Sequence, residues 1–401
     1  MTIPFVRTLV NQAKNFLAHT LAKFEIVCFL KTMPRAQVYG VLFNKAFGHQ
    51  FLYLDWLRRE YNGQVICVVL IDDRSKVSLL FDEFIFFRNW KCIFFKENAQ
   101  FNSIRLEVLN SAMAKLSESK NFIFVDLKNL YYQMPDPKYP EISLLSGGEY
   151  YRYYDIHRYY DLVDAGRNPR PVQLSSSRKR AISDEIRIKR PEFKLDKFVT
   201  LHLRNKGDAA EANSAYRNPT GQSTYFSAIS ELSVRGFSIA CIGETDFDIF
   251  KNVDGVFDFT RDVSPDERLF FQTSCFLFIG NHSGPLLLAA SAGAKVFIAD
   301  AFPFWQAIPG RSNCILYKRC VLSSKKLCYS DIPAFYETLS ETRPEHFKLD
   351  VDVISNTENE IHINLIDYLD SPENIPRYSH LFPAGSLPHH ADNYIGRYFD
   401  S

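Results

Sequence analysis

The sequence lacks an excess of charge of either sign. Its 401 residues include 47 Lys and Arg against 46 Asp and Glu, which leaves a formal net charge of +1. Proteins that bind nucleic acid usually carry a clear basic excess. The balance therefore argues against a nucleic-acid partner, and we expect none.

Long apolar runs are also missing. No stretch approaches the roughly 18–20 apolar residues that a membrane-spanning helix needs, and the N-terminus lacks the apolar core and cleavage site of a signal peptide. Residues 1–24 instead have an amphipathic helical pattern, with one apolar side made of Phe5, Leu9, Phe16, Leu17 and Leu21. Such a helix either packs on its own domain or lies on an anionic membrane surface. We expect a cytoplasmic protein, with a peripheral position on the inner membrane face left open.

Paired cysteines and metal-ligand clusters are absent as well. The 8 cysteines are scattered, with no CxxC pair and no Cys–His cluster at zinc spacing. Most of them lie in apolar runs, which is typical of buried thiols in a reducing compartment. The acidic triplets Asp246–Asp248 and Asp350–Asp352 follow no predicted buried strand, as a metal-binding nucleotide site would require. We therefore predict no obligatory metal.

Three familiar catalytic motifs do not occur. No GxGxxG follows a predicted strand, and GxxxxGK[ST] is missing. The segment GNHSG at 280–284 is not a nucleophile elbow, because its central residues do not follow the Gly-x-Ser-x-Gly order. These absences argue against a dinucleotide-binding fingerprint, a P-loop and an α/β-hydrolase.

Buried strands that alternate with amphipathic helices are present, in two separate series. Apolar runs predict strands in the first half at 38–43, 65–72 and 121–126, with shorter candidates at 84–87 and 92–95 and a helix at 100–120. In the second half, predicted helices at 222–236, 264–274 and 283–293 alternate with predicted strands at 198–203, 237–243, 255–260, 275–280 and 295–300. This alternation is typical of parallel sheets covered on both faces. The predicted fold class is α/β, with two Rossmann-like domains.

The chain is long enough for two cores. Residues 127–196 contain no recognisable buried strand and are rich in Tyr, Pro and basic residues, as expected of surface excursions and a connection. We expect an N-terminal domain at 1–165, a linker and helix at 166–196, a second domain at 197–345, and a C-terminal helix and tail at 346–401.

Candidate binding residues follow the strands of the second series, because ligands of doubly wound sheets bind at the carboxyl ends of strands. His202 and Arg204 end the strand 198–203 with both side chains on one face. The Arg can form a fork on a pyrophosphate and the His can add a hydrogen bond. The alternative is a surface ion pair of Arg204 beside a core histidine.

A second candidate group follows the strand 275–280. Asn281, His282, Ser283 and Gly284 lead directly into a helix, whose free N–H groups and dipole favour an anion. A simple strand–turn–helix needs one capping residue, so this combination favours a phosphate site over a cap alone. After the strand 237–243, Gly243 and Glu244 form a weaker candidate: Glu244 is either an acceptor for ribose hydroxyls or a solvated loop residue.

The first half offers candidates for a general base. His49 lies between the first predicted strand and its helix, and Asp72 and Asp73 end the second strand. Either type of side chain can take a proton from an acceptor hydroxyl. A capping or packed role for His49 remains the alternative.

Two of these segments resemble known enzymes. FVTLHLRN (198–205) resembles the HxR strand of GT-B fucosyltransferases, and FIGNHSGPLLLAASAGAKVF (278–297) is similar to the segment under the donor phosphates in those enzymes and in bacterial heptosyltransferases. The resemblance covers about 198–300, is thinner over 37–75, and suggests a glycosyltransferase of surface-polysaccharide synthesis. Asn205-Lys206-Gly207-Asp208 departs from the fucosyltransferase pattern.

The resemblance implies inverting, metal-independent transfer from a nucleotide-diphosphate sugar, with a GDP-linked donor favoured, to a glycan or lipid-linked acceptor. It implies no cofactor beyond this donor. Arg204 would hold the leaving phosphate with His202 beside it, and His282, Ser283 and Gly284 would match the phosphate-binding helix start. Two alternatives remain open: a nucleotide-sugar epimerase of the same fold, and an inactive sugar-binding or scaffold protein.

Overall fold

The computed structural model describes residues 3–32, 35–42, 57, 60–61, 64–71, 90–95, 102–119, 122–126, 174–204, 221–281, 283–301, 313–322, 325–326, 351–375 and 394–395. The chain forms two compact units. The first comprises residues 1–82 and 87–132, and the second comprises residues 83–86 and 133–401.

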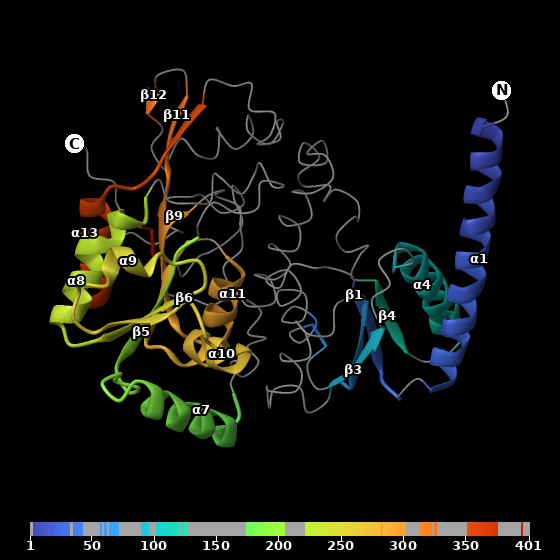
Figure 1. Ribbon diagram of the computed structural model, residues 1–401, viewed down its shortest axis with the longest axis horizontal. Coiled ribbons are helices and arrows are strands. Elements are labelled where there is room, and N and C mark those ends of the chain that lie inside the picture. The colour runs from blue at the N-terminus through green and yellow to red at the C-terminus, as the bar shows by residue number, and fades with distance from the viewer. Residues whose placement is uncertain are drawn as a thin grey trace. The chain divides into compact units, whose positions relative to one another are not determined.

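The first unit contains a four-stranded parallel sheet with the order β3-β2-β1-β4. Its strands are β1 (Val38–Leu42), β2 (Ile66–Ile71), β3 (Trp90–Phe95) and β4 (Ile123–Asp126). The helices are α1 (Ile3–Thr32) and α4 (Asn102–Ser119), which pack against each other (Figure 1). Side chains from both helices and two strands share one apolar core: Ile26, Tyr39, Cys67, Leu109 and Met113.

The second unit is built on a seven-stranded sheet with the order β14-β10-β9-β8-β5-β6-β7, in which every pairing is parallel. Its strands are β5 (Phe198–His202), β6 (Ser238–Ile242), β7 (Val256–Phe259), β8 (Leu277–Gly280), β9 (Lys295–Ala301), β10 (Cys314–Tyr317) and β14 (Tyr394–Ile395). The central strands are buried along their whole length, as strands covered on both faces must be.

Helices cover both faces of this sheet (Figure 1). On one face, α8 (Phe226–Val234) follows the 3-10 turn η4 (Gln222–Tyr225) and contacts α9 (Phe247–Phe250) and α13 (Glu358–Asp370). On the other face, α10 (Pro265–Ser274) contacts α11 (Gly284–Ser291) and α7 (Ser176–Lys189). Gly236 and Gly293, with φ of 79° and 88°, end the helical segments before β6 and β9.

A small antiparallel sheet with the order β12-β11-β13 completes the second unit. It consists of β11 (Arg319–Leu322), β12 (Lys325–Lys326) and β13 (Val351–Ile354). After β13, a capping box between Thr357 and Glu360 starts α13, and the turn η7 (Pro372–Asn374) follows that helix.

The predicted α/β fold class is confirmed, because each unit contains helices and a parallel sheet. The predicted strands of the second series all occur, within one or two residues at each end. The segment 222–236 differs, because its first turn is 3-10 and the α-helix begins at Phe226. Strands β10 to β14 were not predicted.

Candidate functional site

The strand order of the large sheet reverses between β5 and β8, which is the topological switch point of the sheet. We call this point the reversal of the sheet. From β5 the chain adds β6 and β7 on one side, then returns and adds β8, β9 and β10 on the other side. This is the strand order 3-2-1-4-5-6 of doubly wound folds, in which ligands bind outside the carboxyl ends of the strands at the reversal. The described residues at this point are those that end or follow β5 and β8: His202–Arg204, Asn281, Ser283 and Gly284.

His202 ends β5 and is buried. Its Nδ1 lies 3.3 Å from Oγ of Ser283, which joins the two strand ends. A β-carbon on Gly243 would lie 2.7 Å from His202 Cδ2, so only glycine leaves room for the ring. Burial, followed by the positive charge of Arg204, lowers the pKa of His202 to about 4. The imidazole is therefore neutral at pH 7, with one nitrogen that donates and one that accepts.

Gly280 allows β8 to lie close to the end of β5. The two residues Gly280 and His202 are partners in the parallel register. A β-carbon at position 280 would lie 2.3 Å from the His202 carbonyl oxygen, which is a backbone atom and cannot turn aside. Glycine is thus needed where the sheet reverses.

The main chain of Arg204 is held from both sides. Its N–H donates to Oδ1 of Asn281 at 3.1 Å, and its carbonyl accepts from Nε2 of Gln222 at 3.3 Å. The same Gln222 side chain donates to the carbonyl of Glu244 at 3.2 Å and accepts from the N–H of Asp246 at 2.6 Å. Gln222 therefore fixes the chain after β5 to the chain after β6, with the half-buried Arg204 at the edge between them.

Asn281 extends this network into the core. Its Nδ2 donates to the hydroxyl of Tyr225 at 2.9 Å and to the carbonyl of Ala299 at 3.2 Å. Burial, followed by the negative charge of Asp300, raises the pKa of Tyr225 well above its usual value of 10. Tyr225 therefore stays protonated, and the position of the Arg204 backbone depends on fully buried polar side chains.

Helix α11 begins differently from α7, α10 and α13, each of which has a side-chain cap. Ser283 occupies its N-cap position in an extended conformation, but the serine side chain makes no capping hydrogen bond. Its Oγ lies against His202 instead. The first-turn N–H groups of α11 thus receive no side-chain cap from the residue placed to supply one, and such groups together with the helix dipole favour an anion.

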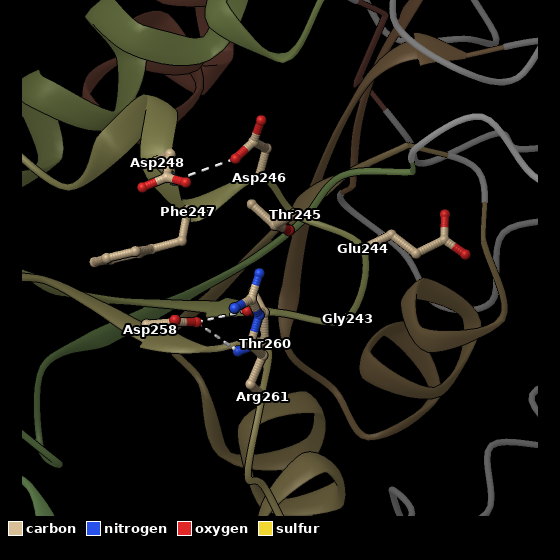
Figure 2. A pocket seen from close by; sticks show the side chains of 9 residues that line it. All are labelled: Gly243, Glu244, Thr245, Asp246, Phe247, Asp248, Asp258, Thr260 and Arg261. Carbon is tan, nitrogen blue, oxygen red and sulfur yellow. Dashed lines mark hydrogen bonds between the residues drawn. The ribbon is translucent and has the colours of Figure 1, made fainter.

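A cavity of about 350 Å³ lies beyond the carboxyl ends of β6 and β7. Nine residues line it, as Figure 2 shows: Gly243, Glu244, Thr245, Asp246, Phe247, Asp248, Asp258, Thr260 and Arg261. Asp258 is oriented by the N–H and the hydroxyl of Thr260, at 2.9 and 2.6 Å. Gly243 both lines the cavity and contacts the His202 ring, so the cavity borders the β5–β8 site.

The prediction that the triplet Asp246–Asp248 follows no buried strand is wrong. The triplet Asp246–Asp248 does follow a buried strand, β6, from which only Gly243, Glu244 and Thr245 separate it. Asp246 caps α9 by accepting the N–H of Asp248 at 3.2 Å. Among the residues that the structure describes, no group of three or more His, Cys, Asp or Glu side chains is arranged to hold a metal ion.

The structure brings together most of the predicted binding residues and leaves others undescribed. His202, Arg204, Asn281, Ser283 and Gly284 lie at the reversal of the sheet, and Gly243 and Glu244 border the adjoining cavity. The remaining candidates lie outside the described residues: His49, Asp72, Asp73 and His282.

Sequence reasoning did not select the residues that support the site. Gln222 lies 18 residues from Arg204, Thr245 lies 44 residues from Leu201 and Tyr225 lies 56 residues from Asn281, so no local pattern identifies these pairs. Thr245 is an example, because its Oγ1 accepts the N–H of Leu203 at 2.9 Å. Arg261 had a usable signal, since it directly follows the predicted strand 255–260, whereas Asp258 lies within that strand.

No protein-family model and no curated protein matches the chain. Among solved structures it resembles a glycosyl transferase of family 9 from Veillonella parvula (11% identity, 66% of this chain and 80% of that chain, TM-score 0.42). It also resembles ADP-heptose lps heptosyltransferase II from E. coli (10%, 70% and 84%, 0.37) and POFUT1 (12%, 66% and 98%, 0.35). These similarities are too distant to carry an argument about chemistry, so the function proposed below rests on the geometry of the chain's own site.

Proposed function

We propose that the carboxyl edge of the large sheet binds the diphosphate of a nucleotide-diphosphate sugar, and that the protein is a glycosyltransferase. One observation carries this proposal: at the reversal of the sheet, Ser283 leaves the start of α11 uncapped while the backbone of Arg204 is fixed beside it. Uncapped N–H groups and a guanidinium are the groups that bind a diphosphate. Both would stabilise the negative charge that grows on the departing diphosphate, where fixed dipoles contribute most to catalysis.

We assign the adjoining cavity to the nucleoside of the donor. It borders the diphosphate site through Gly243, and acidic side chains line it. Carboxylates accept hydrogen bonds from ribose hydroxyls, and in doubly wound sheets an acidic residue after the second strand has this role. Glu244 follows β6, the second strand of this unit, and is the residue we assign to the ribose.

The proposed reaction is an inverting transfer of the sugar. The acceptor oxygen attacks the anomeric carbon opposite the diphosphate, the bond from that carbon to the diphosphate oxygen breaks, and a base takes the acceptor proton. His49, or one of Asp72 and Asp73, is the base we propose. The acceptor is a glycan or a lipid-linked saccharide, the pathway is surface-polysaccharide synthesis, and the reaction needs no metal.

The first experiment measures thermal unfolding of the protein with GDP, UDP, ADP, CMP and dTDP. A ligand at 100 times its dissociation constant stabilises the fold by about 2.7 kcal/mol. We expect one nucleoside diphosphate, with GDP favoured, to raise the melting temperature. Arg204→Ala should weaken its binding about 100-fold, because hydrogen bonds between charged groups are lost.

A matched control is Arg187→Ala, since Arg187 lies in the same unit, on α7, and forms an exposed ion pair with Asp184. It should leave binding unchanged. Binding that survives Arg204→Ala would remove the basis of the proposal, and an absence of any shift would favour the scaffold alternative.

A second experiment separates transfer from epimerisation. The protein is incubated with the identified donor, with and without a pool of saccharide acceptors, and release of free nucleoside diphosphate is measured. A transferase releases it only, or far faster, with acceptor present. Conversion of the sugar within the intact donor, without acceptor, would establish the epimerase instead.

A further inference from the structure

Helix α1 has two apolar sides, of which the first unit covers one. Ala18, Ala22 and Ile26 repeat every four residues and are at most 2% exposed. Ile26 belongs to the core shared with α4 and the sheet. These small or branched side chains are the face by which α1 packs on its own unit (Figure 1).

The other side of α1 carries large side chains in contact with solvent. Phe16 is 76% exposed and Phe24 is 69% exposed. Each precedes a buried residue, Ala18 or Ile26, by two positions, which is about 200° around the helix. Leu17, Leu21 and Val27, each at least 51% exposed, widen this surface, which we call the outer face of α1.

The concentration of these residues distinguishes the outer face from ordinary surface. Of the eleven exposed large apolar side chains among the described residues, five lie within residues 16–27 and the others are scattered over both units. Single exposed apolar residues are normal on soluble proteins, whereas a contiguous group marks an interaction surface.

The charge of α1 indicates the partner. Its sequence contains four basic residues, Arg7, Lys14, Lys23 and Lys31, and one acidic residue, Glu25. A second copy of the chain would bring two sets of these lysines together around a shared apolar contact, and the repulsion would oppose pairing. Anionic lipid headgroups would instead be attracted by the same lysines while Phe16 and Phe24 enter the boundary of the acyl chains.

The helix has the features of an in-plane element. Within the described parts of the chain, no helix has both the length and the apolar character required to cross a bilayer. We propose that the outer face of α1 binds an anionic lipid bilayer, with the helix parallel to the membrane surface. This surface is separate from the sugar-nucleotide site and does not depend on it.

The test is flotation of the full-length protein with vesicles of phosphatidylcholine alone or with 30% phosphatidylglycerol, where the percentage is about that needed for a strong surface charge. We expect binding to the anionic vesicles, weakened by added salt. The double variant Phe16→Gln/Phe24→Gln should lower the partition coefficient about 100-fold, because two large apolar side chains no longer enter the lipid. Lys14→Gln/Lys23→Gln should lower it about 30-fold on anionic vesicles.

The matched control is Ile188→Gln/Val234→Gln, which changes two side chains that are each 83% exposed in the second unit. This control should bind vesicles like the unchanged protein. Thermal unfolding and nucleoside-diphosphate binding should be the same in all variants, because Phe16 and Phe24 are exposed and remote in sequence from the site. Equal flotation of the Phe16/Phe24 variant, or a dimer in light scattering that only this variant loses, would overturn the proposal.

Discussion

Helices α10 and α11 lie side by side on one face of the large sheet, but their N-termini are built in opposite ways. In α10, Ser264 Oγ accepts the Glu267 N–H at 3.1 Å and Glu267 Oε2 accepts the Ser264 N–H at 2.7 Å, a complete capping box. In α11, the equivalent Ser283 turns to His202. Serine at the N-cap thus supplies a capping hydrogen bond to α10 but none to α11.

The first turn of α10 also contains a buried, ion-paired carboxylate. Glu267 is 1% exposed, and Lys189 of α7 donates to its Oε1 at 2.9 Å. Burial alone would raise the pKa of Glu267, but the hydrogen bonds from Ser264 and Lys189 outweigh burial and lower it. A helix start that already holds a carboxylate has no place for a phosphate. The comparison teaches that the identity of the N-cap residue does not show whether a helix start is capped; the direction of its side chain does.

The largest predicted effect concerns the strand that leads into α11. Gly280→Ala would force a methyl group against the His202 carbonyl oxygen, and we expect the free energy of unfolding to fall by about 3 kcal/mol. Urea unfolding measures this change. Gly221→Ala is the control, since its new β-carbon would lie 3.5 Å from Ser223 Oγ, an ordinary contact. Similar stabilities for both variants would mean that the close approach of β8 to β5 is not needed.

The two helix starts should respond to acid at different pH. The unfolded chain protonates His202 near 6.5 while the folded chain does so near 4, so between these values the unfolded state binds more protons and stability falls as pH falls. The loss can reach about 3 kcal/mol. Glu267 has a lowered pKa, so the stability that it contributes is present above 4.5 and is lost only as pH drops further. Urea unfolding from pH 7.5 to 4.5, compared with His202→Gln, isolates the histidine; equal slopes for both proteins would contradict this assignment.

Removing the support of Asn281 should have a smaller effect. Tyr225→Phe deletes the hydroxyl that accepts from Asn281 Nδ2 and leaves a buried N–H unpaired, at a cost of about 2 kcal/mol. Asn281→Ala and the double variant complete a double-mutant cycle in urea unfolding. We expect the two changes to be less than additive by about 1 kcal/mol, and simple additivity would show that the two side chains do not act together.

The smallest effects test the comparison directly. Ser264→Ala should lower the free energy of unfolding by about 1 kcal/mol, because a cap is lost, and should leave nucleotide binding unchanged. Ser283→Ala removes no cap but loses the contact with His202, so it should lower the free energy of unfolding by about 0.5 kcal/mol. It should weaken nucleoside-diphosphate binding several-fold in isothermal titration. The reverse pattern would show that α10, not α11, faces the ligand.

The sequence predicted the parts of the site that lie within one strand–turn–helix segment. His202 with Arg204 and the segment 280–284 each sit where a predicted strand ends, and a rule on parallel sheets was enough to select them. The capping box of α10 is also local, because Ser264 and Glu267 lie three residues apart. The role of Ser283 was taken as part of a helix start, whereas its contact is with a histidine 81 residues away.

What the sequence could not supply is the way distant segments meet. Gln222 bridges the carbonyls of Arg204 and Glu244, which no periodicity relates to each other. The N-terminal helix shows the same limit, since its apolar pattern indicated an amphipathic helix but not which side would pack. The structure buries Ala18 and Ala22 and exposes Phe16 and Leu17, the reverse of an expectation based on side-chain size.

The reversal of the sheet also has a consequence for folding. Strands β5, β6 and β7 pair in the order in which they are synthesised, so these pairs can form before β8 is made. Strand β8 must instead return past both of them to reach β5, across about eighty residues of chain. The contact of His202 with Ser283 therefore forms only when this return is complete. Ligand binding at this point would thus report that β8 has joined β5, and a chain stopped before β8 could hold paired β5, β6 and β7 strands without the binding site.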